Sequence, residues 1–529
     1  MRTTLTGIGT LTRLAVRRDR FLLGAGTLLL VGICAASAIA TSSLYSTAAQ
    51  QVAAAQAIDA SPALVALYGP ILDTGSVGEL AMTKMTVLYA VFVAVLLGVL
   101  VRRHTRSEEE SGRAELLAGT AIGRATPLAA ATAEGVGASL LVGAGAAVVD
   151  VAAGLPMIGS LLFGASWTGI GIVATGLTAT ACQLSASTRT CAAITAGALG
   201  ALFALRAVGD TTELWLSWLS PFGWSTQLRA WSGPRWWVLL LYPATAAALL
   251  ATAHLLRARR DLDGGLLAPR PGPAIGSPRL GDATALTIRL HATTVFVWTA
   301  AIAVLGLALG AIAPNIGDLL GSPSGRDLLA RIGGVGAVQD ALLAAELSIV
   351  AVLVSCFAVT VITHGGAEEH DGRTEQVLAT ATSRRRVYLA TVAVAIGGTT
   401  WLLLIAGLSM AVGFGAVAGN LSDGIHRTLP AALAQAPAVW LVTALAMTAY
   451  ALRSTLAAAG WVLLALFLTL GQVGELLRLP SWAIDISPFA HVPRMPVEGF
   501  ALAPTVTMSF LAVALLAAGA ASYRTRDIG

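Results

Sequence analysis

Long apolar stretches recur along the whole chain, and they restrict its possible folds more than any other feature. Of its 529 residues, 56% are hydrophobic and only 12% are charged, a charged fraction about half that of an ordinary soluble domain. A run of about 18 or more apolar residues is long enough to cross the hydrocarbon layer of a bilayer as a helix. The sequence therefore predicts an all-α polytopic membrane protein.

The apolar stretches predict about twelve transmembrane helices, six in each half of the chain. In the first half we expect them at about 21–43, 82–101, 127–152, 157–182, 190–208 and 236–257. In the second half we expect them at about 289–313, 342–363, 387–417, 431–451, 455–473 and 499–521. Six crossings return the chain to its starting side, so the halves would form two parallel six-helix repeats.

The stretches between these helices predict the domain boundaries. Residues 1–20 form an N-terminal cytoplasmic segment, whose apolar residues at helical spacing suit an amphipathic helix on the inner membrane face. A cleaved signal peptide is the alternative, because small residues follow the first apolar run. The predicted domains are then a first half at 21–257, a cytoplasmic linker rich in Pro, Gly and charge at 258–286, a second half at 287–523 and a cytoplasmic tail at 524–529.

The arginines predict which side of the membrane the termini occupy. They are more frequent on the side that would hold both termini than in the opposite loops. Cytoplasmic loops carry the excess of basic residues, so both termini are predicted to be cytoplasmic. The use of Arg rather than Lys, with abundant Ala and Gly, suggests a bacterial plasma membrane, and the net charge of +5 then reflects orientation and not nucleic-acid binding.

Motifs for intrinsic enzyme chemistry are missing from the sequence. Lys84, the one lysine of the chain, lies in AMTKMTV and lacks the glycine before it and the Ser/Thr after it that a Walker A loop requires. The four cysteines and seven histidines show no metal-ligand spacing, so we expect packing roles for the cysteines and hydrogen bonds for His104 and His364. The chain is therefore predicted to be no enzyme and to hold no cofactor or metal.

The most charged segment of the chain occurs twice. Residues 104–124, the first charged loop, return 260 residues later as residues 364–384, the second charged loop, with nine of 21 positions identical. Leu116, Leu117 and Ala121 would offer a small apolar face beside the acids, which suits docking on a partner. The alternative is a solvated loop whose charges only set topology. The identical pairs are His104/His364, Glu108/Glu368, Glu109/Glu369, Gly112/Gly372, Arg113/Arg373, Glu115/Glu375, Thr120/Thr380, Ala121/Ala381 and Arg124/Arg384.

The pattern Glu-Glu-x-x-Gly-Arg-x-Glu in each loop resembles the cytoplasmic loop of type 2 ABC exporter permeases. The resemblance implies a fused twelve-span permease of the antibiotic and multidrug exporters, in which each loop is a coupling helix for a separate ABC ATP-binding subunit. It implies two such subunits, which carry ATP and Mg²⁺, and an amphipathic substrate. The coupling residues would be Glu108, Glu109, Gly112, Arg113, Glu115, Glu368, Glu369, Gly372, Arg373 and Glu375.

Two points qualify the resemblance. Glu110-Ser111 of the first charged loop becomes His370-Asp371 in the second, so the two docking surfaces would be unequal. Twelve spans in two parallel halves also fit a proton-coupled secondary multidrug transporter, in which Glu134 would be the coupling residue.

A substrate path is predicted only from residue types. Ionisable residues within spans are costly and often functional, which singles out Glu134 and Glu346 as a proton relay or a site for cationic drugs. A satisfied carboxylate near the interface is the alternative for both. Trp215, Trp218 and Trp224 would form either an interfacial aromatic belt or an outer gate.

Overall fold

The computed structural model describes residues 5–45, 47–59, 62–212, 215–261, 264–267, 277, 280–315, 335–470 and 480–528. All regular structure in these ranges is helical, as predicted. Eleven of the described helical segments are long and apolar enough to span a membrane, and the shorter apolar segment Ser454–Leu468 occupies the start of the predicted span at 455–473. The end of that span, part of the linker and parts of both termini lie outside the described residues.

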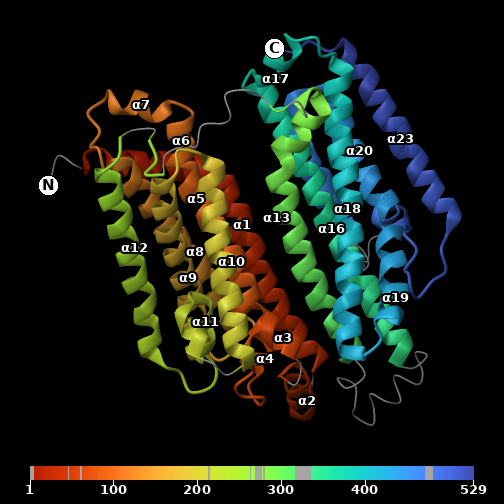
Figure 1. Cartoon of the computed structure of the whole chain (residues 1–529). Coiled ribbons are helices and arrows are strands. Elements are labelled where there is room, and N and C mark those ends of the chain that lie inside the picture. Colours follow the sequence, from red (N-terminus) through yellow and green to blue (C-terminus); the bar gives the residue numbers. More distant parts are fainter. Residues whose placement is uncertain are drawn as a thin grey trace. The chain divides into compact units, whose positions relative to one another are not determined.

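The chain divides into two compact units, Met1–Gly272 and Pro273–Gly529 (Figure 1). The division falls inside the predicted linker. The first unit contains six of the eleven long segments, and the second contains five together with Ser454–Leu468.

The helices of the first unit are α1 (Ile8–Leu44), α2 (Ala48–Asp59), α3 (Pro62–Tyr68), α4 (Val77–Lys84), α5 (Ala90–Arg103), α6 (Arg106–Glu110), α7 (Arg113–Ala118), α8 (Thr126–Ala152), α9 (Met157–Leu184), α10 (Thr188–Thr212), α11 (Pro221–Gln227) and α12 (Leu241–Ala258). The helices of the second unit are α13 (Ala283–Ile312), α16 (Val335–His370), α17 (Arg373–Leu378), α18 (Arg384–Ala418), α19 (Leu421–Ala434), α20 (Ala436–Leu452), α21 (Ala459–Leu468), α22 (Ser481–Ile484) and α23 (Leu502–Thr525).

The amphipathic N-terminal segment is not a separate helix. Its described part continues without a break into the first span as α1, a helix of 37 residues. The buried Asp19 on α1 pairs with Arg103 at the end of α5, which holds the amphipathic part against the first unit.

Small residues let the helices of each unit pack closely. A Cβ on Gly143 of α8 would lie 2.3 Å from the carbonyl oxygen of Gly164 on α9. In the second unit, a Cβ on Gly310 of α13 would lie 2.0 Å from the carbonyl oxygen of Met410 on α18. Association of helices in lipid depends on such close packing, because lipid tails are as apolar as the side chains themselves. Gly143 and Gly310 therefore serve as helix contacts.

The core of the first unit is centred on Trp167 of α9, which is fully buried. Its indole N–H donates to the carbonyl oxygen of Met85, 3.0 Å away. Met85 begins a turn of π-helix, Met85–Tyr89, which joins α4 to α5. The indole thus satisfies a backbone acceptor where the regular helical pattern is interrupted.

Candidate functional site

The two charged loops adopt the same backbone geometry. In the first, α6 ends at Glu110, Gly112 has φ of 72°, and the short helix α7 follows. In the second, α16 ends at His370, Gly372 has φ of 70°, and α17 follows. Each glycine N–H donates to the carbonyl oxygen three residues earlier, at 2.9 Å in the first loop and 3.0 Å in the second. Each charged loop is therefore a helix end, a left-handed glycine and one short helix.

In each charged loop, a glutamate that precedes the glycine forms an ion pair with the arginine that follows it. Arg113 lies 3.3 Å from Glu108, and Arg373 holds both oxygens of Glu368 at 2.6 and 2.8 Å. Arg373 also lies 2.7 Å from Asp371, and these two carboxylates raise the pKa of the Arg373 guanidinium above its ordinary value. Such pairs on an exposed surface stabilise little by themselves, so their main effect is to orient the arginines.

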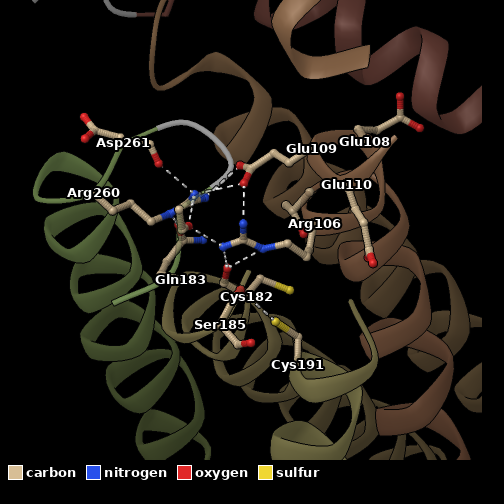
Figure 2. Close-up of polar contacts among 12 residues, drawn as sticks. Arg106, Glu108, Glu109, Glu110, Cys182, Gln183, Ser185, Cys191, Arg260 and Asp261 are labelled. Atoms are coloured by element: carbon tan, nitrogen blue, oxygen red, sulfur yellow. Dashed lines mark hydrogen bonds and ion pairs between the residues drawn. The ribbon is translucent and has the colours of Figure 1, made fainter. Parts of the chain in front are cut away.

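The second glutamate of each loop points inward. The Glu109 carboxylate is 6% exposed and is surrounded by three arginines. Figure 2 labels two of them, Arg106 and Arg260. Arg260 donates to both of its oxygens at 2.7 and 2.9 Å, Arg106 lies 2.8 Å away, and Arg257 lies 3.1 Å away. Arg257 belongs to α12 and Arg260 follows its end, so this cluster ties the first charged loop to the last helix of its unit.

The arginines around Glu109 also bind the end of α9. Arg106 donates to the carbonyl oxygen of Cys182 at 2.6 Å, and Arg260 donates to the side-chain oxygen of Gln183 at 2.8 Å (Figure 2). A buried carboxylate is stable only when its charge is paired and its oxygens accept hydrogen bonds. Glu109 meets both conditions, so the cluster joins α6, α9 and α12 firmly.

Glu369, the counterpart of Glu109, is held in a similar way with different partners. Its carboxylate is 9% exposed and forms an ion pair with Arg526, which directly follows α23. The Tyr450 hydroxyl of α20 donates to the same carboxylate at 3.1 Å. The Arg526 guanidinium lies 4.9 Å from the centre of the Tyr523 ring, a cation–π contact. Each unit therefore connects its charged loop to an arginine at the end of its last helix.

The predicted coupling residues differ in burial: Glu108, Gly112, Glu368 and Gly372 are half-buried, and the other six fall into two groups. Glu109 and Glu369 are buried, whereas Arg113, Glu115, Arg373 and Glu375 are exposed. Leu116, beside Glu115 on α7, is 77% exposed, as the predicted apolar face requires. In the second loop residue 376, at the corresponding position, is a glutamine. An exposed surface of one short helix therefore remains available in each loop.

The loops differ at the position of Glu110. Its carboxylate accepts a hydrogen bond from the backbone N–H of Thr188, 3.0 Å away, at the start of α10. An acid at this position also interacts favourably with the positive end of the helix dipole. The counterpart His370 carries no carboxylate. The acid missing from the second loop is therefore one that caps a helix of the first unit.

The residues predicted to line a substrate path are distributed over both units. Glu134 is buried on α8 in the first unit and Glu346 is buried on α16 in the second. Trp215 is 65% exposed, Trp218 stacks on Trp237 with ring centres 5.4 Å apart, and Trp224 is buried. The Trp224 indole N–H donates to the carbonyl oxygen of Trp218 at 2.6 Å. Trp218 and Trp224 thus have packing partners within their own unit.

Sequence reasoning missed the arginines that hold the second glutamates. Arg257, Arg260 and Arg526 were expected only to set orientation, as basic residues at the ends of spans. They do not match one another at the 260-residue spacing of the loops, so a comparison of the two halves by position cannot find them. Their place in the sequence, just at the end of the last span of each half, was the available signal.

A known protein resembles the chain over nearly its full length. The chain is 37% identical to the multidrug efflux system permease protein Rv1217c of Mycobacterium tuberculosis (strain ATCC 25618 / H37Rv) over 526 residues, 99% of this chain and 95% of that protein. Residues 280–524 match the family described as multidrug efflux system permease Rv1217c, C-terminal domain. The chain belongs to the multidrug efflux system permease family. This permease is a multi-pass membrane protein.

Proposed function

We propose that the chain is the membrane-spanning permease subunit of an ATP-driven efflux transporter, an ABC exporter of type 2. It would export amphipathic compounds such as antibiotics or drugs across a bacterial plasma membrane. Two copies of a separate ABC ATP-binding subunit would supply the energy, one docked on each charged loop. The observation that carries the proposal is the buried connection between each charged loop and the last helix of its unit.

A docking surface for an ATP-binding subunit must pass the motion of that subunit to the membrane spans. A partner that moves can drive a permease only if the surface it pushes is attached to the spans. Glu109 attaches the first charged loop to Arg260 beyond α12, and Glu369 attaches the second to Arg526 beyond α23. Burying a carboxylate is costly, and a loop that only sets membrane topology has no need of it. These buried ion pairs therefore favour transmission of force from a docked partner to the spans.

The exposed groups of each loop suit recognition by a partner protein. Arg113 and Glu115 in the first loop, and Arg373 and Glu375 in the second, present both signs of charge on a short helix. Charges arranged in this way steer and orient a partner, whereas Leu116 offers an apolar contact. ATP and Mg²⁺ would bind the partner, since the chain has no Walker A lysine.

The orientation follows from the arginines. Both charged loops and both termini would be cytoplasmic, where an ATP-binding subunit finds its nucleotide. The name of the relative, a multidrug efflux permease, supports drug-like substrates for this chain.

The test is efflux from vesicles that contain the chain together with its candidate ATP-binding subunit. We expect efflux of an amphipathic dye that requires ATP and continues after the proton gradient is collapsed by a protonophore. The matched control is the same complex with a partner that binds ATP but does not hydrolyse it. Efflux that needs no partner and stops when the gradient collapses would instead establish a proton-coupled secondary transporter.

A further inference from the structure

Three ionisable side chains of the first unit, two of them buried and one half-buried, meet beside the start of the first charged loop. They are Asp19 of α1, His104 at the end of α5 and Glu134 of α8. The His104 Nε2 atom lies 2.9 Å from one oxygen of Asp19 and 3.4 Å from one oxygen of Glu134. Among the described residues of the chain, this is the one group of His, Cys, Asp or Glu side chains close enough to hold a metal ion.

A single arginine lies beside the two carboxylates of this group. Asp19 is fully buried and pairs with Arg103 at 3.0 Å, but Glu134 is 2% exposed and neither of its oxygens accepts a hydrogen bond. A buried carboxylate without a partner is strongly disfavoured, above all in a helix of a membrane protein. One imidazole nitrogen cannot donate to two carboxylates at once, because it carries at most one hydrogen. A cation between the three side chains would satisfy all of them.

We propose that Asp19, His104 and Glu134 bind one divalent transition-metal ion, such as Zn²⁺ or Mn²⁺. Two ligands that are each about 2.1 Å from a metal ion lie about 3 to 3.5 Å apart, which matches the two distances from His104. All three ligand atoms lie within 4.8 Å of one another, so small side-chain rotations complete the set. One imidazole and two carboxylates suit a first-row divalent ion rather than an alkali metal ion.

A cavity reaches His104, one of the three proposed ligands. His104 forms part of the wall of a cavity of about 340 Å³, which Arg18, Glu108 and Arg124 also line. These polar side chains belong to α1 and to the first charged loop, at the end of the unit where α1 begins (Figure 1). The cavity therefore leads from the charged loop to the imidazole.

The site would belong to the first unit alone. In the second unit His364 lies 3.5 Å from Glu368 and packs against His291 with ring centres 5.1 Å apart. The residue 260 positions after Glu134 is Val394, which offers no ligand. Because His104 is the first residue of the first charged loop, a bound ion would attach the start of that loop to α1 and α8. The second charged loop would have no corresponding metal site.

The test is metal binding by the full chain, purified in detergent and freed of metal with a chelator. Co²⁺ is titrated while visible absorption is recorded, Zn²⁺ is used as competitor, and bound metal is counted by mass spectrometry. We expect one ion per chain and an absorption spectrum without the strong thiolate bands of a cysteine site. Glu134→Gln and His104→Gln should each weaken binding on the order of 100-fold, since each removes a ligand.

The matched control is Asp150→Asn. Asp150 lies on the same helix as Glu134, is fully buried, and its oxygens likewise accept no hydrogen bond, but it belongs to no such cluster. Its replacement should leave metal binding unchanged. Failure of the parent chain to retain an ion, equal affinity in Glu134→Gln and Asp150→Asn, or a thiolate spectrum would each overturn the proposal. Should Glu134→Gln not fold, as judged by gel filtration, Asp19→Asn provides the same comparison.

Discussion

The Arg260 guanidinium donates two hydrogen bonds to the Glu109 carboxylate, at 2.7 and 2.9 Å, although the two residues lie 151 positions apart. The contact joins a charged loop to the chain segment just beyond the last helix of the same unit. It is a two-bond pair between a planar guanidinium and a carboxylate, the geometry that makes arginine pairs both strong and directional. In the second unit Arg526 and Glu369 form the corresponding pair.

Replacement of Glu109 by glutamine should destabilise the first unit far more than the same change at Glu108. Glu109→Gln leaves three arginines around a neutral amide, and loss of one partner of a buried ion pair costs about 3 kcal/mol. The same replacement at the more exposed Glu108 should lower the free energy of unfolding by about 0.5 kcal/mol. Thermal unfolding in detergent measures both variants, and equal effects would contradict the role assigned to Glu109.

Loss of both exposed arginines should weaken the partner complex without unfolding the chain. In the double variant Arg113→Ala with Arg373→Ala, only surface ion pairs are removed, so the melting temperature should change little. Co-purification of the ATP-binding subunit and ATP-driven efflux should both fall about tenfold or more, because charges at an interface orient the partner.

The control for the double variant is Arg235→Ala. Arg235 precedes α12 and so lies at the opposite end of that helix from the charged loop. We expect normal partner binding and efflux in this control variant. Unchanged assembly and efflux in the double variant would contradict the proposal that the partner docks on the charged loops.

A side chain at either left-handed glycine should cost stability through the backbone alone. Gly112 and Gly372 have φ of 72° and 70°, and an added Cβ at either one would meet no atom within 4 Å. Gly112→Ala and Gly372→Ala should therefore each cost about 1 kcal/mol, with asparagine less harmful and valine more. Thermal unfolding of the three variants at each position gives the order, and an equal cost for asparagine and valine would exclude the backbone explanation.

An alanine at Gly143 should disturb the packing of α8 on α9. Its Cβ would lie 2.1 Å from the Thr168 hydroxyl oxygen and 2.3 Å from the Gly164 carbonyl oxygen, closer than real Cβ atoms approach. Overpacking of this kind costs about 1 to 3 kcal/mol. Gly137→Ala is the matched control on the same helix, because its Cβ would meet nothing within 4 Å. Comparable yields and melting temperatures for the two variants would contradict the close helix contact.

The sequence alone determined the helical class, most of the spans and the place of the two charged loops. Within apolar runs of membrane-spanning length, no water can bind the backbone N–H and C=O groups, so they must form their hydrogen bonds within a helix. The glycine of each loop was visible as an identical position, and the structure explains it by the positive φ that only glycine adopts without strain. The short helices α2 and α3, between the first two spans, were not predicted, because their apolar runs are too short to stand out.

The tertiary structure alone decided which charges of the loops are buried. Glu108 and Glu109 are adjacent and chemically identical, yet only Glu109 turns toward the arginines at the end of α12. No periodicity within the loop reveals this, because the choice depends on where a helix about 150 residues later ends. The same holds for Asp19, His104 and Glu134, which are far apart in the chain and meet only because α1, α5 and α8 pack side by side. Local patterns fix what a segment can become, whereas burial and pairing depend on neighbours that the local sequence does not contain.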